Sequence, residues 1–119
     1  MNTNLIIFRQ APYGTSYTGE GIRVLSSLEA FEVGCSVLFT DDGVFSLMKN
    51  QNPEALEMKS LGKVFESLLE FGVQDILVST ESLNQRGIQK EELIDVDVQF
   101  VDNKEIRRIM QQSRNILTF

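Results

Sequence analysis

The chain alternates between short apolar runs, which are typical of buried strands, and segments in which apolar residues recur at three- and four-residue steps, which are typical of helices. Parallel strands need long crossover connections, and helices normally supply them on the faces of the sheet. The alternation therefore predicts an α/β fold, a three-layer α/β/α sandwich around a five-stranded, mainly parallel sheet. The expected strands are residues 4–8, 35–40, 75–79, 96–101 and 115–119.

Four segments with helical character separate these strands. The first, 16–33, is expected to end at Gly34, and the second to end at Gly72, because glycine readily takes the left-handed conformation that follows a helix. The third is a short helix at 80–87, and Asp102 is expected to cap the fourth. The apolar positions expected to face the sheet are Ile22, Leu25, Leu28, Leu61, Val64, Phe65, Leu68, Leu69, Ile106, Ile109 and Met110.

Length and composition limit the classes of protein to consider. A chain of 119 residues supports one hydrophobic core, so we expect a single domain over 1–119. Seventeen acidic against eleven basic residues give a net charge of −6, which argues against direct nucleic-acid binding, because such binding relies on Lys and Arg. One cysteine excludes an internal disulfide, and no apolar run has the length of a signal or membrane-spanning segment. We therefore expect a soluble protein of a reducing compartment, with no membrane association.

A polar turn follows the second predicted strand. Thr40, Asp41, Asp42 and Gly43 come directly after apolar residues and would lie at the carboxyl edge of the sheet, where ligands and partners meet an open parallel sheet. Two neighbouring carboxylates suggest Mg²⁺, but adjacent side chains of an extended segment point apart, and the third strand ends in Ser79 rather than in another acid. We expect these residues to form turn structure, with no metal and no cofactor.

The loop after the first strand contains Tyr13, Gly14 and Thr15, which would lie at the same edge and line a shallow pocket. Its glycines invite a phosphate-loop interpretation, but their spacing matches neither of the common phosphate-binding glycine motifs. A tight strand-to-helix turn, with Thr15 or Ser16 as the N-cap of the helix, explains the same residues more simply.

Cys35 is the only thiol of the chain. It begins the second predicted strand, which places it at the opposite edge of the sheet from the strand ends, in apolar surroundings where a thiol stays protonated. The chain also lacks histidine, the usual general base near neutral pH. We therefore predict no catalytic residue. An exposed, persulfide-carrying Cys35 is a separate hypothesis, which thiol titration of the native protein would test.

An apolar cluster follows the acidic turn. Val44, Phe45, Leu47 and Met48 lie on a short helical turn whose side chains cannot all face the sheet. An exposed apolar patch of this kind is typical of protein interfaces. We expect these four residues to take part in a contact with another subunit.

Five short motifs, taken in their order, resemble one protein family. They are A-P-Y-G-T at 11–15, G-E-G at 19–21, D-D-G-V-F at 41–45, S-L-N-Q-R-G at 82–87 and I-L-T-F at 116–119. Over essentially its whole length the chain resembles the TusC/DsrF branch of the DsrE/DsrF/DsrH sulfur-relay family. The resemblance implies the same α/β/α fold, as one DsrE/DsrF-like domain, and a cytoplasmic location.

The resemblance also implies a function and partners. It indicates a subunit that assembles with TusB/DsrH-like and TusD/DsrE-like paralogues into a hetero-hexamer. That complex would pass persulfide sulfur, with a TusE-like relay protein as an indirect partner, toward 2-thiolation of the tRNA wobble uridine. In the TusD/DsrE branch the sulfur-carrying cysteine ends the third strand, and the matching position here is Ser79. Serine cannot hold a persulfide, so the resemblance implies a non-catalytic subunit whose paralogue supplies the thiol.

Two other functions stay open from the sequence. The Dsr branch of the family implies a subunit for sulfur oxidation rather than for tRNA thiolation, and neighbouring genes would separate these two roles. A stand-alone α/β module that binds a small ligand would need a pocket at the strand-end edge. A co-purified ligand would favour that module.

Overall fold

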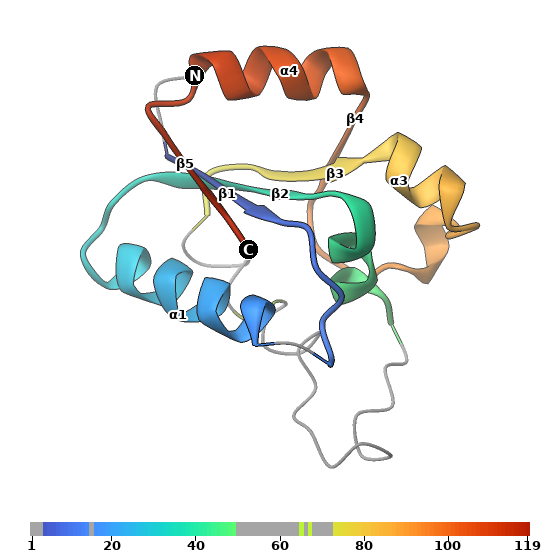
Figure 1. The fold of residues 1–119 in the computed structure, drawn as a ribbon, viewed down its shortest axis with the longest axis horizontal. Coiled ribbons are helices and arrows are strands. Elements are labelled where there is room, and N and C mark those ends of the chain that lie inside the picture. The colour runs from blue at the N-terminus through green and yellow to red at the C-terminus, as the bar shows by residue number, and fades with distance from the viewer. Residues whose placement is uncertain (1–3, 15, 50–64, 66, 68–72) are drawn as a thin grey trace.

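The computed structural model describes residues 4–14, 16–49, 65, 67 and 73–119. Five strands form one sheet in which every neighbouring pair is parallel, in the order β4-β3-β2-β1-β5 (Figure 1). This confirms the predicted five-stranded sheet. The strands are β1 (Asn4–Phe8), β2 (Cys35–Phe39), β3 (Ile76–Ser79), β4 (Gln99–Val101) and β5 (Asn115–Thr118).

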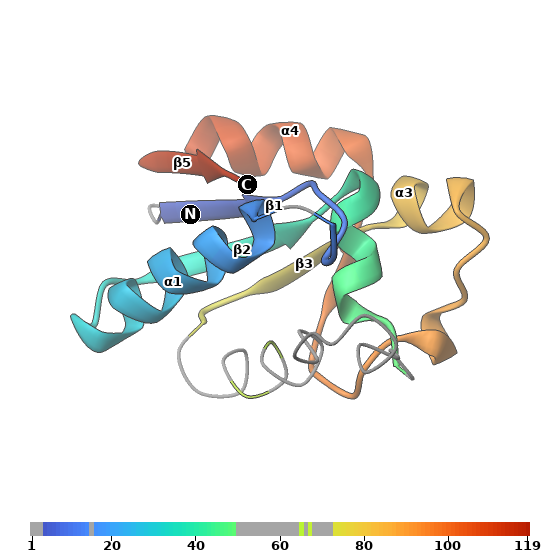
Figure 2. The same ribbon diagram turned by 60° about the horizontal axis from the view of Figure 1, so that its bottom comes forward.

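Helices cover both faces of the sheet, which confirms the three-layer arrangement. α1 (Tyr17–Ala30) lies on one face and α4 (Asn103–Gln112) on the other, as the turned view shows most clearly (Figure 2). Three short elements lie near the carboxyl ends of the strands: η1 (Asp41–Leu47), α3 (Thr80–Gln85) and η3 (Lys90–Glu92). No helix in the described part of the chain is both long and apolar enough to cross a membrane.

The strands divide the hydrophobic core into two layers, because successive side chains of a strand point to opposite faces. Ile6 and Phe8 of β1 belong to the layer beneath α1, together with residues of β2, β3 and η1. Leu5 and Ile7 belong to the layer beneath α4, which Ile109 completes. β1 is thus buried on both faces, as expected of a near-continuous apolar run in a parallel sheet.

Aromatic rings dominate the layer beneath α1. Phe8 stacks on Phe39, with ring centroids 5.3 Å apart, and the ring of Phe65 meets both edge-on at 5.0 and 5.1 Å. Phe65 is one of two described residues in the region predicted as the second helix, and both of them are helical. Leu61, Val64, Leu68, Leu69 and the expected stop at Gly72 lie outside the described residues.

The end of α1 corrects one expectation. The helix stops at Ala30, and Glu32 rather than Gly34 takes the left-handed conformation, with φ of 58°. The N–H of Val33 donates to the carbonyl of Leu28 at 2.8 Å, the long hydrogen bond of a Schellman ending. The left-handed residue that follows the helix therefore lies two residues before the glycine, and the helix itself ends four residues before it.

β4 is shorter than the alternating pattern predicted. The ladder contains Gln99–Val101, whereas the pattern predicted a strand over 96–101. Val96 and Val98 are half-buried against the core layer beneath α1 without pairing in the sheet. Their alternating apolar pattern therefore reflects packing of the connecting segment and not strand pairing.

Candidate functional site

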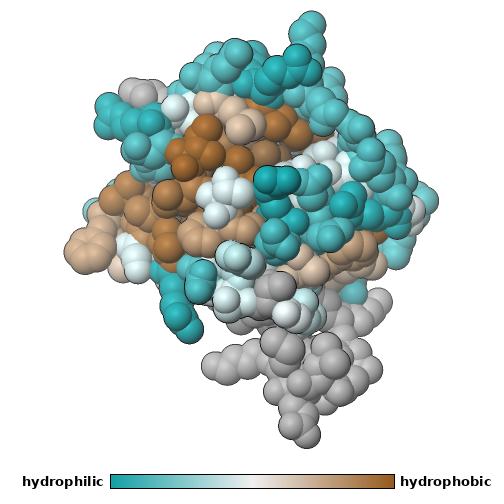
Figure 3. Space-filling view, in the orientation of Figure 1, coloured by the Kyte–Doolittle hydropathy of each residue, from teal (hydrophilic) through white to brown (hydrophobic). Residues whose placement is uncertain are grey.

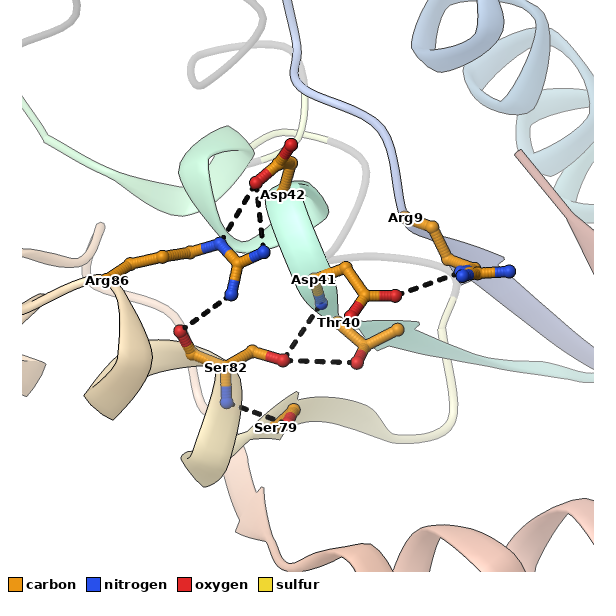
Figure 4. Close-up of polar contacts among 7 residues, drawn as sticks. All are labelled: Arg9, Thr40, Asp41, Asp42, Ser79, Ser82 and Arg86. Atoms are coloured by element: carbon orange, nitrogen blue, oxygen red, sulfur yellow. Dashed lines mark hydrogen bonds and ion pairs between the residues drawn. The ribbon is translucent and has the colours of Figure 1, made fainter.

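The candidate site is the edge of the sheet at which β1, β2 and β3 end (Figure 4). The chain turns sharply there after β2: Asp41 takes a left-handed φ of 51°, and the N–H of Gly43 donates to the carbonyl of Thr40 at 2.9 Å. Aspartate tolerates this conformation better than most residues do. Gly43 lies so close to the end of β1 that a Cβ there would be 1.9 Å from the carbonyl oxygen of Phe8.

Serine and threonine hydroxyls connect the turn to α3. The hydroxyl of Ser82 accepts a hydrogen bond from the N–H of Asp41 at 2.9 Å and lies 3.2 Å from the hydroxyl of Thr40. Ser79 is the N-cap of α3, and its hydroxyl accepts from the N–H of Ser82 at 3.1 Å. Ser79 and Ser82 are both buried, so this network fixes the turn on α3 from inside.

Two arginines hold the neighbouring aspartates apart. The Nε of Arg9, just after β1, lies 3.0 Å from an oxygen of Asp41. Arg86, at the end of α3, contacts Asp42 through Nε at 3.0 Å and Nη2 at 2.9 Å, and its Nη1 donates to the carbonyl of Ser82 at 3.2 Å. Both aspartates and Arg9 are about half exposed, and Arg86 is partly buried, so each pair contributes only about 0.2–1 kcal/mol to stability. Their main effect is to orient the side chains of the turn.

The directions of the Asp41 and Asp42 carboxylates determine whether the two could bind one metal ion together. Each carboxylate turns toward its own arginine, on different sides of the turn, and the two do not converge on a common point (Figure 4). A hard cation needs several oxygens around one position. Among the described residues no group of three or more His, Cys, Asp or Glu side chains is placed to hold a metal ion.

The loop after β1 contributes less to the site than the turn after β2. Tyr13 is half-buried and Gly14 is exposed with φ of 96°, a value that favours glycine. Thr15 lies outside the described residues, and Ser16 is the N-cap position of α1 without a side-chain capping hydrogen bond. The hydroxyl of Thr18 donates to the carbonyl of Ala11 at 3.2 Å and ties the loop to the helix.

Cys35 lies at the other end of the sheet, as the first residue of β2, and its side chain is fully buried. Burial raises the pKa of the Cys35 thiol above its usual range, and the negative charge of Glu29 raises it further. Burial also raises the pKa of Glu29, one of whose carboxylate oxygens is buried without a hydrogen-bond partner among the described residues. Both effects keep the thiol in its unreactive, protonated form.

The raised pKa of Cys35 predicts a specific loss of stability at alkaline pH. The folded chain keeps the proton to a higher pH than the unfolded chain, whose thiol has a pKa of 9.0. The resulting stabilisation is complete below pH 9.0 and is lost as the pH rises through the folded-state value. Urea unfolding between pH 8 and 10.5 should therefore show a steeper decline for the natural chain than for Cys35→Ala, by at most about 1.4 kcal/mol per pH unit. Parallel curves for the two proteins would contradict the shift.

The structure corrects half of the expected interface. Val44 and Leu47 are fully buried in the core layer beneath α1, because η1 folds back over the end of the sheet and its inner face packs there. These two residues are therefore unavailable for a contact with another subunit. Phe45 and Met48 are only half-buried, and for them the interface stays a prediction.

Sequence reasoning missed Arg9, Ser82 and Arg86 as parts of the site. Arg9 directly follows a predicted strand, and Arg86 directly precedes the glycine expected to end the short helix at 80–87. Both positions therefore indicated residues near the strand-end edge. Their aspartate partners lie 32 and 44 residues away in the chain. Local spacing does not show such pairs.

Comparison with known proteins identifies the family. The family model described as DsrE/DsrF-like matches residues 4–119. A TusC homolog of Pseudomonas aeruginosa is 34% identical over 96% of this chain and 95% of its own length. The TusC protein of Buchnera aphidicola is 34% identical over 95% of both chains. The intracellular sulfur oxidation protein DsrF of Allochromatium vinosum is 29% identical over 93% of this chain and 91% of its own.

A solved structure shows the same fold. The ychN protein of E. coli superposes with a TM-score of 0.83 over 100% of both chains, at 22% sequence identity. Together with the match of the family model over nearly the whole chain, these relatives confirm the resemblance drawn from the five motifs. The chain therefore belongs to the DsrE/DsrF-like family, and its relatives there include proteins of the TusC and DsrF type.

Proposed function

We propose that this chain is a non-catalytic subunit of a TusBCD-like sulfur-relay complex, which supports persulfide transfer toward 2-thiolation of the tRNA wobble uridine. Relatives named TusC, similar over nearly their whole length, support the assignment to a sulfur relay. The observation that carries the non-catalytic role is the burial of the only thiol, Cys35, at the opposite end of the sheet from the strand-end site.

Sulfur transfer between persulfides needs a thiolate that an incoming thiol can reach. Cys35 is fully buried, and its pKa is raised, so it offers neither access nor a thiolate near neutral pH. The position expected to match the sulfur-carrying cysteine of the TusD/DsrE branch is Ser79, whose hydroxyl is buried and caps α3. The thiol of the relay would therefore come from a paralogue.

The proposed complex contains TusB/DsrH-like and TusD/DsrE-like paralogues in a cytoplasmic hetero-hexamer, with a TusE-like relay protein as an indirect partner. In this arrangement the chain binds no nucleic acid itself and contributes surface to the assembly. Phe45 on η1 and Met48 directly after it, both half-buried close to the strand-end site, are proposed to contact another subunit there.

Sulfur labelling tests the proposal. The complex is incubated with a cysteine desulfurase, its relay proteins and radiolabelled cysteine, and its subunits are then separated on a non-reducing gel. Label should appear on the TusD-type paralogue and not on this chain. Cys35→Ser should leave transfer through the complex within about two-fold, which corresponds to roughly 0.4 kcal/mol in the barrier.

A second arm uses this chain without its paralogues, in the same mixture, and should give no labelled product. Label on this chain that disappears in Cys35→Ser would reject the non-catalytic role and would favour a persulfide on Cys35. Folding of the variant is checked by its melting temperature, so that a loss of transfer is not mistaken for a loss of structure.

Similarity to the sulfur oxidation protein DsrF favours a second role, in which the same kind of subunit serves sulfur oxidation. Both roles require the same assembly and differ in the final sulfur acceptor. Genes of TusB, TusD and TusE type beside the gene for this chain would indicate tRNA thiolation. Genes for dissimilatory sulfite reductase in that place would indicate sulfur oxidation.

A further inference from the structure

β5 forms an edge of the sheet, because β1 is its only neighbour among the described strands. All four of its residues are exposed, and its two large apolar side chains, Ile116 and Leu117, are 38% and 43% exposed. They pair with Leu5 and Ile6, which belong to core layers on opposite faces, so they extend both faces of the sheet. Figure 3 shows hydrophobic surface in the area where Figure 1 places β5, bordered by the hydrophilic surface over α4.

The hydrogen bonds to β1 show which backbone groups of β5 point outward. Just beyond the strand, Phe119 donates its N–H to Ile7 at 2.8 Å and accepts from Arg9 at 2.7 Å, so both of its backbone groups point toward β1. Backbone groups of successive strand residues point to alternate sides. The N–H and C=O groups of Ile116 and Thr118 therefore point away from β1, into the open edge.

Apart from its short length of four residues, β5 has none of the usual protections against edge-to-edge pairing within the part of the chain that the structure describes. Such protections include a lysine or another charged residue on the strand, a proline, a bulge, and a covering helix or loop. β5 reads N-I-L-T and pairs with β1 in unbroken register. An exposed apolar edge with free backbone groups matches an extended segment of another chain, which adds to the sheet as one more strand.

Basic residues gather beside the edge. Lys104, Arg107 and Arg108 of α4 and Arg114, directly before β5, are all exposed. No described acidic residue forms an ion pair with any of them. Residues 103–119 contain these four basic residues and one acidic residue, whereas the whole chain has a net charge of −6. A partner at this edge is therefore expected to present acidic side chains beside its strand.

We infer that β5 receives an edge strand from a different, acidic subunit of the complex, which continues the sheet beyond β5. The inference rests on the proposed function, because it takes a paralogue of the relay complex as the partner. The protein partner is favoured over a nucleic acid because apolar side chains and outward backbone groups occupy the centre of the surface. A phosphate backbone would use only the basic margin.

A second copy of this chain fits the edge less well. Antiparallel pairing of two β5 strands about a twofold axis would bring the basic margins of both copies together, and like charges side by side are unfavourable. Pairing of β5 with β4 of the next copy would match its acidic neighbours Asp95 and Asp97, but this head-to-tail contact leaves an unpaired edge at each end unless it closes into a ring. A different subunit brings no second basic margin and leaves no repeating array of open edges.

Backbone substitution tests the inference without changing the charge of the surface. Thr118→Pro removes an N–H that points outward and leaves the ladder to β1 intact, because proline is tolerated at such edge positions. Thr118→Val is the matched control, since it keeps the N–H. When this chain carries an affinity tag and is co-expressed with TusB- and TusD-type paralogues, Thr118→Pro should recover at least tenfold less of one paralogue than the natural chain, and Thr118→Val should match the natural chain.

Three further measurements keep the result interpretable. Leu117→Lys places a charge on the edge and should reproduce the loss of recovery. This variant tests the same edge without a proline, in case Thr118→Pro affects folding. Arg107→Glu with Arg108→Glu should weaken recovery severalfold at low salt, while Arg23→Glu, on the exposed side of α1, should not. Amide exchange followed by NMR should show the N–H groups of Ile116 and Thr118 protected only in the complex.

The outcomes separate this inference from the proposed function. If the natural chain recovers both paralogues and so does Thr118→Pro, the edge is not the contact, whereas the relay function stands. If the natural chain recovers no paralogue, both fail. A change from oligomer to monomer in Thr118→Pro alone in solution would assign the edge to a second copy, and loss of RNA binding in the arginine variants would assign it to a nucleic acid. Either result would overturn the inference.

Discussion

Gly43→Ala should lower the free energy of unfolding by at least about 3 kcal/mol, at the upper end of the range for overpacked sites. A Cβ at this position would lie 1.9 Å from the carbonyl oxygen and 2.5 Å from the carbonyl carbon of Phe8, and 3.1 Å from the N of Arg9. These are backbone atoms, so no side-chain rotation relieves the clash. Either η1 or the end of β1 has to move, and the carbonyl of Phe8 also accepts a hydrogen bond from the N–H of Thr40 at 3.1 Å.

Gly19→Ala is the matched control, because a Cβ at Gly19 meets no atom within 4 Å. Gly19 lies inside α1, where alanine is the better helix former, so this substitution should stabilise the chain by about 0.5–1 kcal/mol. Urea unfolding with unchanged m-values measures both effects. Equal effects of the two substitutions would show that the close contact between η1 and β1 is absent in solution.

The close contact at Gly43 also explains why the candidate site depends on the fold. Asp41 and Asp42 start η1, and their positions follow from how η1 lies against β1. Displacing η1 would separate Asp41 from Arg9 and from the hydroxyl of Ser82. Gly43→Ala should therefore disturb the strand-end site even in the fraction of molecules that stays folded.

Sequence reasoning predicted the strands well because each is a short apolar run that is buried on at least one face. β1, β2 and β3 have almost no exposed side chain, so their composition is dictated by the core. The order of the strands could not be predicted in the same way, because it depends on which face of the sheet each crossover connection covers. The chain alternation predicted a parallel sheet but not the order β4-β3-β2-β1-β5.

The candidate site was predicted less completely, for two physical reasons. The burial of Val44 and Leu47 depends on η1 folding over the end of the sheet, and a short apolar turn does not indicate which of its sides will be covered. The pairing of Asp41 with Arg9 and of Asp42 with Arg86 joins residues far apart in the chain. Such pairs depend on which strands are neighbours, so they cannot be predicted before the strand order is known.

In β5 the strand itself was predicted, but its exposure was not. Residues 115–119 were expected to close the sheet, and β5 does pair with β1 along its length. An apolar strand in sequence suggests burial, yet all of β5 is exposed on this chain. The apolar side chains and the outward backbone groups are explained together if burial is completed by another subunit, and this is the physical basis of the interface inferred above.

Phe8→Ala should cost about 3–5 kcal/mol of unfolding free energy, the range for removal of a buried aromatic ring. Phe8 is fully buried, and its ring contacts those of Phe39, Phe65 and Phe119, with centroids 5.3, 5.0 and 6.2 Å away. One substitution thus opens a cavity between β1, β2 and the layer beneath α1, and it also removes aromatic pairs worth about 0.5–1.5 kcal/mol each beyond their burial.

Phe31→Ala is the control for Phe8→Ala, because Phe31 is 81% exposed and its truncation should change stability by no more than about 0.5 kcal/mol. Phe8→Leu should fall between the two, since it keeps most of the volume and loses the ring contacts. The three variants are compared by urea unfolding at constant m-value. If Phe8→Ala lowers the free energy of unfolding no more than Phe31→Ala does, the aromatic core around Phe8 is rejected.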